Sequence, residues 1–366
     1  MSSTQTDVRA ARTPIVAVTG AASGVGALLT ERLAASSEVR RVMALDERRG
    51  EVAEAEWHTL DVRDPAIADR LRGDGRPADV VVHLALDLDL ERDPTARTAY
   101  NVRGTQTVLT AAAAAGVRRV VLCTSAMVYG ALPDNDVPLA EDAELRATAE
   151  ATGVGDLLEI ERLARRAPRA HPGLNVTVVR PAILVGGTDT ALTRHFESPR
   201  LLVVAGSRPC WQFCHIEDLV SALEYAALEK AEGELAVGCD GWLEQEEVEE
   251  LTGTRRMELP SAVALGAASR LHRLGLTPSP AGDLAYTMHP WVVSGRRLHE
   301  AGWRPGWTNE EVLAELVEEV SGRHTVAGRR LGRKDATAAG ATAAGATVAL
   351  LGTAALVRRA RKRRGL

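Results

Sequence analysis

A short apolar run, a glycine-rich turn and an amphipathic segment follow one another at residues 15–33, and this succession constrains the fold more than any other feature. The run reads IVAVT, the turn reads TGAASGVG, and the segment behind it repeats valine and leucine at helical spacing. A strand that passes through such a turn into a helix begins the β-α-β unit of a parallel sheet.

Glycine is expected at each of three positions in the turn for a different geometric reason. We expect Gly20 to permit the tight turn, Gly24 to let the backbone approach a pyrophosphate, and Gly26 to let the helix pack against the strand. Ser23 and Val25 lie at the N-terminus of the helix, where free N–H groups and a partial positive charge favour phosphates. The turn therefore predicts a dinucleotide-binding site, with a plain loop as the alternative.

Two carboxylates follow strand-like segments further along the chain. Asp46 comes 26 residues after Gly20 and is expected to accept hydrogen bonds from the adenosine ribose, which favours NAD over NADP. Arg48 and Arg49 beside it weaken that discrimination, and a solvated turn residue is the alternative for Asp46. Asp61 is placed to reach the adenine amino group.

Further cofactor contacts are expected at strand ends. Val62 follows Asp61, and the sequence His-Leu-Ala at 83–85 ends a buried strand, where Leu84 and Ala85 reach the edge at which ligands bind. For His83 itself the alternative is a histidine whose hydrogen bonds are satisfied within the protein.

The order of the remaining segments indicates an α/β fold. Apolar runs at 39–45, 79–85, 119–124 and 176–180 alternate with helical segments near 95–115 and 156–167, as in a parallel sheet covered on both faces. After residue 181 the alternation fades, and helices are expected at 217–229, 244–251, 260–274 and 308–321. The fold class is a Rossmann doubly wound parallel sheet with a smaller mixed α/β C-terminal lobe.

The expected organisation has six parts. These are a polar N-terminal arm (1–13), an NAD-binding Rossmann domain (14–181), a smaller substrate lobe interleaved with it (182–321), a basic linker (322–335), an Ala/Gly-rich segment (336–357) and a basic tail (358–366).

Charge is distributed unevenly along the chain. The net charge is −5, but residues 322–366 hold eleven Lys/Arg and one acid, a balance of +10, which leaves −15 for residues 1–321. Such an asymmetry indicates that the tail meets something anionic. Nucleic acid is not expected as the partner, because the acidic body would be repelled by it.

The segment 337–357 has no charged residue and is long enough to span a bilayer, although its Ala, Thr and Gly content makes insertion marginal. Three interpretations stay open: a tail anchor, a helix on an anionic membrane surface, and a low-complexity arm. In the first two, residues 336–366 tether a cytoplasmic body to the inner face of the membrane.

The four cysteines, Cys123, Cys210, Cys214 and Cys239, are expected as free thiols of a reducing cytosol. Buried small hydrophobic side chains are favoured over a zinc site, since further well-placed ligands are lacking, and no metal is predicted.

Several motifs together resemble the extended short-chain dehydrogenase/reductase family, in its NAD-dependent epimerase/dehydratase branch. They are TGAASGVG, LDVRD (60–64), HLA (83–85), NVRGT (101–105), TSAMVYG (124–130), Arg180-Pro181, FCHIEDL (213–219) and GWRPGWT (302–308). The resemblance implies NAD as cofactor, a nucleotide sugar as small-molecule substrate, contacts from Asn101, Arg180 and Pro181, and a homodimer through the helices near 95–115 and 156–167.

The same resemblance implies a catalytic Ser, Tyr and Lys, in which the Tyr accepts the substrate hydroxyl proton. Ser125 matches the Ser, but Gly153 and Leu157 occupy the Tyr and Lys positions, and no YxxxK occurs anywhere in the chain. Tyr129 is expected to be structural. Asp156 or Glu159 are weak substitutes for the base, with a solvated helix face as the alternative.

Two further departures concern the nucleotide sugar. Ile183 stands where many members have an Asn, and Trp211 and Gln212 stand where an Arg is common, with Arg208 a little upstream. Two functions therefore remain: an NAD-dependent epimerase/dehydratase with atypical catalytic residues, and an inactive NAD-binding sensor or scaffold. Whether the chain is an enzyme is left open.

Overall fold

The computed structural model describes residues 13–73, 75–89, 92–149, 152–198, 200–274 and 281–321, together with the backbone of 325–326 and 329–330. The expected linker, Ala/Gly-rich segment and basic tail therefore lie almost wholly outside the described residues, as does the N-terminal arm up to residue 12. Within the described part of the chain, no helix is long and apolar enough to cross a membrane.

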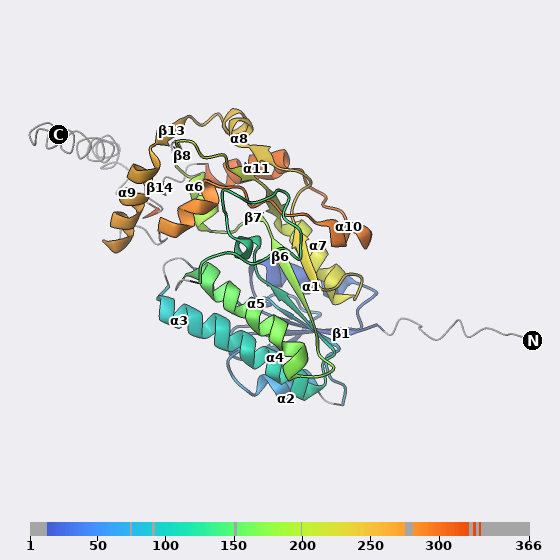
Figure 1. Cartoon of the computed structure of the whole chain (residues 1–366). Helices are drawn as coiled ribbons and strands as arrows, with labels where there is room; N and C mark the ends of the chain where they lie inside the picture. The colour runs from blue at the N-terminus through green and yellow to red at the C-terminus, as the bar shows by residue number, and fades with distance from the viewer. Residues whose placement is uncertain are drawn as a thin grey trace, which may run out of the picture.

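A seven-stranded sheet forms the centre of the molecule (Figure 1). Its strands, in spatial order, are β11 (Glu234–Val237), β6 (Asn175–Pro181), β5 (Arg119–Cys123), β4 (Val80–His83), β1 (Ile15–Thr19), β2 (Arg41–Asp46) and β3 (Glu56–Thr59). All six pairings are parallel. The expected Rossmann sheet is confirmed, and its strands end at one edge, where a ligand can be held.

Helices cover both faces of the sheet. α2 (Ile67–Arg72), α4 (Gly104–Ala115) and α5 (Gly153–Ala170) lie together on one face, and α1 (Gly24–Ala35) packs with α7 (Ile216–Ala227) on the other. Side chains alternate accordingly along β1, since Ala17 enters the core on the first face and Val16 and Val18 enter the core on the second.

The helix expected near 95–115 is divided into three pieces. α3 (Pro94–Thr98) passes into a single π-helical turn, η1 (Ala99–Arg103), before α4 begins. Asp93 caps α3 by accepting a hydrogen bond from the Ala96 N–H. The π turn rotates Asn101 inward, where it is fully buried, a change of helical phase that apolar spacing alone does not reveal.

The C-terminal lobe is built from short elements over a core of its own. They are β7 (Ile183–Val185), α6 (Ala191–His195), β8 (Leu201–Val204), β9 (Cys210–Trp211), β10 (Phe213–His215), β12 (Leu243–Glu244), α8 (Gln245–Thr252), β13 (Arg256–Leu259), α9 (Ser261–Arg273), η3 (Ala281–Thr287), α10 (Arg296–Glu300) and α11 (Asn309–Val320). A two-stranded pair, β14 (Thr325–Val326) and β15 (Arg329–Arg330), follows.

The two parts of the chain are interleaved. Residues 216–237 come after the expected boundary at 181, yet they supply α7 and the edge strand β11 of the large sheet. In the opposite direction, the segment after η2 (Ala126–Tyr129) enters the lobe, where Leu139 pairs with Val293.

A buried ion pair joins these parts behind the carboxyl edge of the sheet. Arg180 of β6 and Glu161 of α5 form a two-pronged contact, with Nε–Oε1 and Nη2–Oε2 distances of 2.8 Å, and both side chains are 1 % exposed. Arg180 Nη1 also donates to the Tyr129 hydroxyl and to the Glu141 carbonyl, each at 2.8 Å. Helix α5, the short helix η2, strand β6 and the 130–149 loop therefore share one polar junction.

We predict that Glu161→Ala lowers the free energy of unfolding by about 3–5 kcal/mol, because the Arg180 charge stays buried without its partner. Glu159→Ala is the matched control on the same helix: Glu159 pairs with Arg162 at the surface, a contact worth at most about 1 kcal/mol. Urea unfolding measures the free energy of unfolding of both variants. Equal decreases would show that the buried pair contributes no more stability than the surface pair.

Candidate cofactor site and the neighbouring polar cluster

The glycine-rich turn after β1 is packed as its sequence requires. Gly20 has φ +71°, and a Cβ placed there would lie 2.7 Å from the Ala85 nitrogen. A Cβ on Gly26 would lie 1.9 Å from the Gly20 carbonyl oxygen. Both positions therefore exclude any side chain, since backbone fills the space.

Gly24 differs from the other two glycines. Its φ is +52°, and no atom lies within 4 Å of the place where a Cβ would be. Gly24 and Ser23 are both exposed. The turn thus presents bare backbone to open space, as close approach of a phosphate requires.

The N-terminus of α1 also keeps its donors available. Ser23 occupies the N-cap in an extended conformation but makes no side-chain capping bond, and the first turn holds no acidic residue. The first N–H groups of a helix have no partner within the helix, so an anion placed at this end receives hydrogen bonds and the favourable end of the dipole.

Asp46 is held beside this turn at the end of β2. Its Oδ2 accepts from the Ala22 N–H at 3.0 Å and its Oδ1 from the Arg48 N–H at 3.2 Å. These bonds tie the half-buried carboxylate to the glycine-rich turn and fix its orientation, which a free turn residue would not have.

Asp61 and Val62 follow β3 on the same side of the sheet. Hydrogen bonds from the Arg63 side chain lower the pKa of Asp61, and the Nε–Oδ1 distance is 2.9 Å. Val62 is buried, and its Cγ2 would lie 3.1 Å from a Cβ on Gly104. Arg63 in turn lies over the Tyr100 ring, 5.4 Å from its centre.

The tautomer of His83 follows from its two neighbours. Thr105 donates to the Asn101 carbonyl at 2.7 Å, so its oxygen receives the proton on His83 Nε2, 3.1 Å away. His83 Nδ1 then accepts from the Thr19 hydroxyl at 2.7 Å. Burial lowers the pKa of His83 to about 4, and the ring stays neutral near pH 7. This is a satisfied strand-end histidine, which holds β1, β4 and α4 together.

Asn101 links the loop after β4 to helix α5. Its Oδ1 accepts from the Asp87 N–H at 2.7 Å, and its Nδ2 donates to the Asp87 carbonyl at 2.9 Å and to Asp156 Oδ2 at 3.2 Å. Asn101 thus fixes the loop that begins with Leu84 and Ala85.

Asp156 is neither a solvated helix residue nor a free base. It is 3 % exposed, and it accepts from Arg97 Nε at 2.9 Å and from the Thr98 hydroxyl at 2.6 Å, besides the Asn101 contact. Its oxygens are already occupied by protein donors. Glu159, in contrast, pairs with Arg162 on an exposed face, as expected for a solvated helix residue.

The expected catalytic positions lack proton-transfer groups. Gly153 begins α5, and no atom lies within 4 Å of where its Cβ would be, whereas Leu157 is buried in the core. Ser125 begins η2 and accepts from the Met127 N–H at 3.2 Å. The serine is therefore present, but neither expected partner position holds a tyrosine or a lysine.

Tyr129 does not replace the missing base. Burial raises its pKa, and its hydroxyl donates to the Glu141 carbonyl at 2.9 Å while it accepts from Arg180. Four donor contacts of the Arg180 guanidinium go to Glu161, Tyr129 and Glu141, so the cofactor contact expected from Arg180 has no support in this geometry. Pro181 ends β6 and is buried.

The positions associated with nucleotide sugars are filled by core side chains. Ile183 is buried, and Trp211 is 1 % exposed, stacks on His195 with ring centres 5.5 Å apart, and donates to Gln245. Gln212 donates to the carbonyls of Cys239 and Val293. Both residues are structural here.

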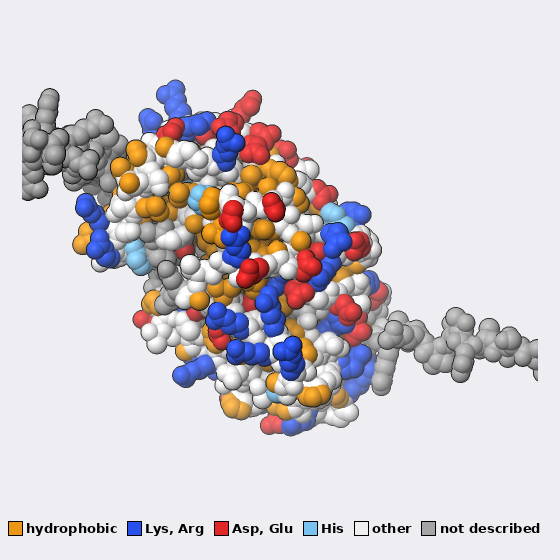
Figure 2. Space-filling model, viewed as in Figure 1, with side chains coloured by type: hydrophobic (Ala, Val, Ile, Leu, Met, Phe, Trp, Pro, Cys, Tyr) orange, Lys and Arg blue, Asp and Glu red, His pale blue; other side chains and the backbone are white. Residues whose placement is uncertain are grey.

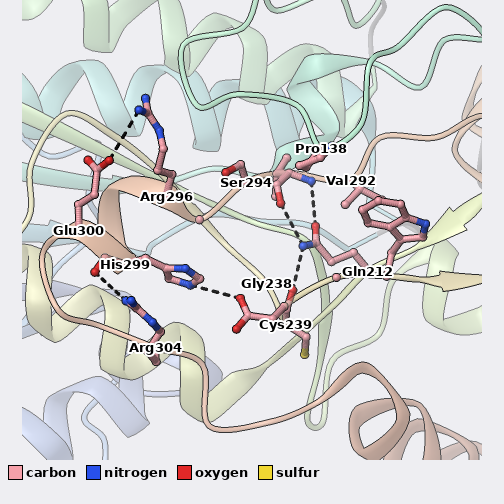
Figure 3. Close-up of a pocket in the computed structure, with 15 residues that line it drawn as sticks. Pro138, Gln212, Gly238, Cys239, Val292, Ser294, Arg296, His299, Glu300 and Arg304 are labelled. Carbon is pink, nitrogen blue, oxygen red and sulfur yellow. Dashed lines mark hydrogen bonds and ion pairs between the residues drawn. The ribbon is translucent and has the colours of Figure 1, made fainter.

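A pocket of about 480 Å³ lies beside α10, at the β11 edge of the sheet, and was not foreseen from the sequence (Figure 3). His299 faces Asp240 across it at 3.4 Å, and Arg296 lies 3.6 Å from Glu300. Gln212 forms part of its floor. The residues that line it come from α10 and from loop segments far apart in the sequence.

All four cysteines are free thiols, with Cys214 and Cys239 buried. Among the described residues, no group of three or more His, Cys, Asp or Glu side chains is arranged to hold a metal ion.

Comparison with known proteins agrees with this architecture. Residues 16–238 match the NAD dependent epimerase/dehydratase family. The chain belongs to this family.

Relatives of similar length extend the match. An uncharacterized protein of Mycobacterium tuberculosis is 31 % identical over 311 residues, 82 % of each chain. A UDP-glucose 4-epimerase of Streptomyces lividans is 28 % identical over 317 residues, 75 % of this chain and 94 % of that protein.

Solved structures share the fold. UDP-glucose 4-epimerase of Thermotoga maritima with UDP-glucose has a TM-score of 0.62 at 19 % identity, covering 83 % of this chain and 97 % of that one. MoeE5 in complex with UDP-glucuronic acid and NAD has a TM-score of 0.61 at 25 % identity, with the same coverage.

The neutral His83 gives a pH-dependent contribution to stability. Between pH 6.5 and about pH 4 the unfolded chain binds a proton at this residue and the folded chain does not, so stability falls as pH falls. We predict that His83→Gln removes up to about 3 kcal/mol of that dependence. Urea unfolding at pH 7 and at pH 4.5 measures how far the free energy of unfolding falls between the two pH values. An equal fall in the variant and in the unchanged protein would contradict a neutral, buried His83.

Proposed function

We propose that this family member binds NAD(H) and works as a non-catalytic sensor or scaffold. The observation that carries the proposal is the contrast between the two halves of the site. The glycine-rich turn, the uncapped α1 and Asp46 are suited to a dinucleotide, whereas Gly153 and Leu157 stand where proton transfer needs a tyrosine and a lysine.

The fit of NAD rests on residues of this chain. Gly24 leaves room for a pyrophosphate, the α1 N-terminus supplies N–H donors, and Asp46 offers an oriented carboxylate to ribose hydroxyls. When bound, the nicotinamide supplies a hydride acceptor. Ser125 would donate one hydrogen bond to a substrate oxygen, and the two positions expected to take the hydroxyl proton hold Gly153 and Leu157.

An epimerase or dehydratase that uses atypical residues is the second candidate. Ser125 favours it, because its hydroxyl proton has no partner among the described residues. The named relatives that act on UDP-glucose make nucleotide sugars the substrates to test.

We also propose that the acidic body, residues 1–321, is cytosolic, as the sequence led us to expect. The tether through residues 336–366 is a proposal that rests on the sequence, and the homodimer through the helices near 95–115 and 156–167 is a proposal that rests on the family resemblance.

Calorimetric titration of the full chain tests cofactor binding. We predict micromolar affinity for NAD⁺ and at least about tenfold weaker binding of NADP⁺, because Asp46 repels a 2′-phosphate. Asp46→Ser should reduce the ratio of the NADP⁺ and NAD⁺ dissociation constants. Asp64 is an exposed acid, and Asp64→Ser serves as the control, for which this ratio should stay the same. Failure to bind either dinucleotide would contradict the proposal.

An assay of turnover distinguishes a non-catalytic NAD-binding protein from an epimerase or dehydratase with atypical residues. We predict no formation of NADH, and no change of the sugar, when the NAD-loaded protein is incubated with UDP-glucose, UDP-galactose or UDP-glucuronic acid. Loss of general-base help alone costs about 10²- to 10⁴-fold in rate. Turnover that Ser125→Ala abolishes would establish the second candidate instead.

A further inference from the structure

Helix α5 carries a stripe of arginines on its outward side. Four exposed residues form this arginine stripe: Arg162, Arg165, Arg166 and Arg169. Residues three, four and seven positions apart lie on the same side of a helix, so the four side chains share one face. No other helix in the described part of the chain contains more than two Lys or Arg residues, and residues 1–321 together have a charge of −15. Helix α5 therefore concentrates positive charge in an acidic molecule.

The arginine stripe has little compensating charge of its own. Glu159 pairs with Arg162 at 2.8 Å, whereas the other three arginines form no ion pair with any described residue. Helix α4, which packs beside α5, has no charged residue between Gly104 and Ala115. Like charges three and four residues apart repel one another along a helix, so an acidic partner would stabilise this face.

Helix α11 presents the opposite charge. It contains five glutamates and no Lys or Arg. Its acidic face consists of the exposed residues that lie opposite its buried apolar side chains: Glu310, Glu311, Ala314 and Glu318. Glu318 follows Glu311 by seven residues, which is also the spacing of the outermost arginines on α5, so each set of charges extends about 10 Å along its helix. The two faces match in length and are opposite in sign.

No arginine or lysine of the described chain neutralises the acidic face of α11. Glu310 and Glu318 form no ion pair among the described residues, and elsewhere on the helix Glu315 contacts His215 at 3.2 Å. The second acidic helix, α8, differs in this respect, because Arg256 pairs with two of its glutamates, at 2.9 and 3.4 Å. Among the described helices, α11 is therefore the acidic counterpart that best fits the arginine stripe.

The two faces lie on different parts of the surface. Where Figure 1 draws α5 across the lower half of the molecule, Figure 2 shows several Lys and Arg side chains. Asp and Glu side chains lie at the upper edge of the same view, where α8 packs against α11. Since neither face finds its partner within the described chain, both can serve a second molecule.

We propose that the arginine stripe of α5 binds the acidic face of α11 in a second copy of this chain. Because the two faces differ, the contact is heterologous, and it either closes when the second copy returns it or continues from copy to copy. The homodimer that the family resemblance implies would instead place two arginine stripes against each other, which like charges oppose. This self-association is separate from NAD binding.

Sedimentation velocity of the full chain tests the proposal. A contact between two helices buries less area than a standard protein interface, so we expect weak association that is present at about 20 mM salt and lost at about 500 mM. A sedimentation coefficient that does not change with protein concentration at low salt would overturn the proposal.

Charge reversal on α5 should weaken the association. The variant reverses the three arginines without an ion pair: R165E/R166E/R169E. Its control reverses three other exposed arginines that form no ion pair among the described residues: R40E/R270E/R273E. We expect the α5 variant to raise the dissociation constant about tenfold or more, and the control to leave it unchanged. If the reversed variant does not fold, the neutral variant R165Q/R166Q/R169Q takes its place and should weaken association in the same direction.

Charge reversal on α11 is the independent test. The variant makes the acidic face basic and keeps Glu311, which caps the helix: E310K/A314K/E318K. Its control makes the same three changes of residue type in the exposed loop before β3: E51K/A53K/E54K. Association that the α5 variant abolishes and the α11 variant leaves unchanged would show that the arginine stripe contacts another surface, and would overturn the proposal.

A mixture of the two reversed variants distinguishes self-association through these faces from a general effect of charge. In the α5 variant both faces are acidic, and in the α11 variant both are basic, so neither should associate alone. Mixed in equal amounts at low salt, they should associate, because each face again meets one of opposite charge. Circular dichroism first establishes that both variants are folded. Folded variants that stay monomeric when mixed would overturn the proposal.

Discussion

The buried pair between Arg180 and Glu161 is the contact on which the interleaved architecture depends. Burying two charges is costly unless nearly every donor and acceptor finds a partner. Here Glu161 Oε1 accepts from both Arg180 and the Thr124 hydroxyl, and Arg180 Nη1 serves Tyr129 and Glu141. Burial lowers the pKa of Arg180, but the hydrogen bonds and charge interactions with Glu161 and Tyr129 together raise it above its ordinary value, so the charge persists. The pair therefore holds α5, β6 and the 130–149 loop at fixed positions.

Glu141 connects this polar junction to the C-terminal lobe. Glu141 is 3 % exposed, its carbonyl accepts from Tyr129 and Arg180, and both its side-chain oxygens lie 3.1 Å from the Arg297 N–H of α10. Burial raises the pKa of Glu141. The lobe is thus positioned by polar contacts to the Rossmann sheet, in addition to its own aromatic core.

The sheet and its turn were predictable because local rules decide them. Buried runs of valine are compatible only with strands covered on both faces. Gly20 and Gly26 have no room for a side chain, and Gly24 has a positive φ beside open space. The smaller lobe was less predictable: β11 is four residues long, and it joins the large sheet after a crossover that no periodicity announces. The π turn at Asn101 and the pocket beside α10 likewise depend on tertiary contacts.

At the candidate site, the missing YxxxK motif says more about function than the motifs that are present. The YxxxK pair was missing from the sequence, but only the structure shows what replaces its contacts. Asp156 lies in the first turn of α5, and a free carboxylate there would be the natural substitute base. Its oxygens are instead taken up by Arg97, Thr98 and Asn101. A carboxylate so enclosed stabilises the join between α3, the π turn and α5, and it would have to lose those bonds to accept a proton. The polar groups around Asp156 are thus part of the scaffold, while the glycine-rich turn presents open backbone at Gly24.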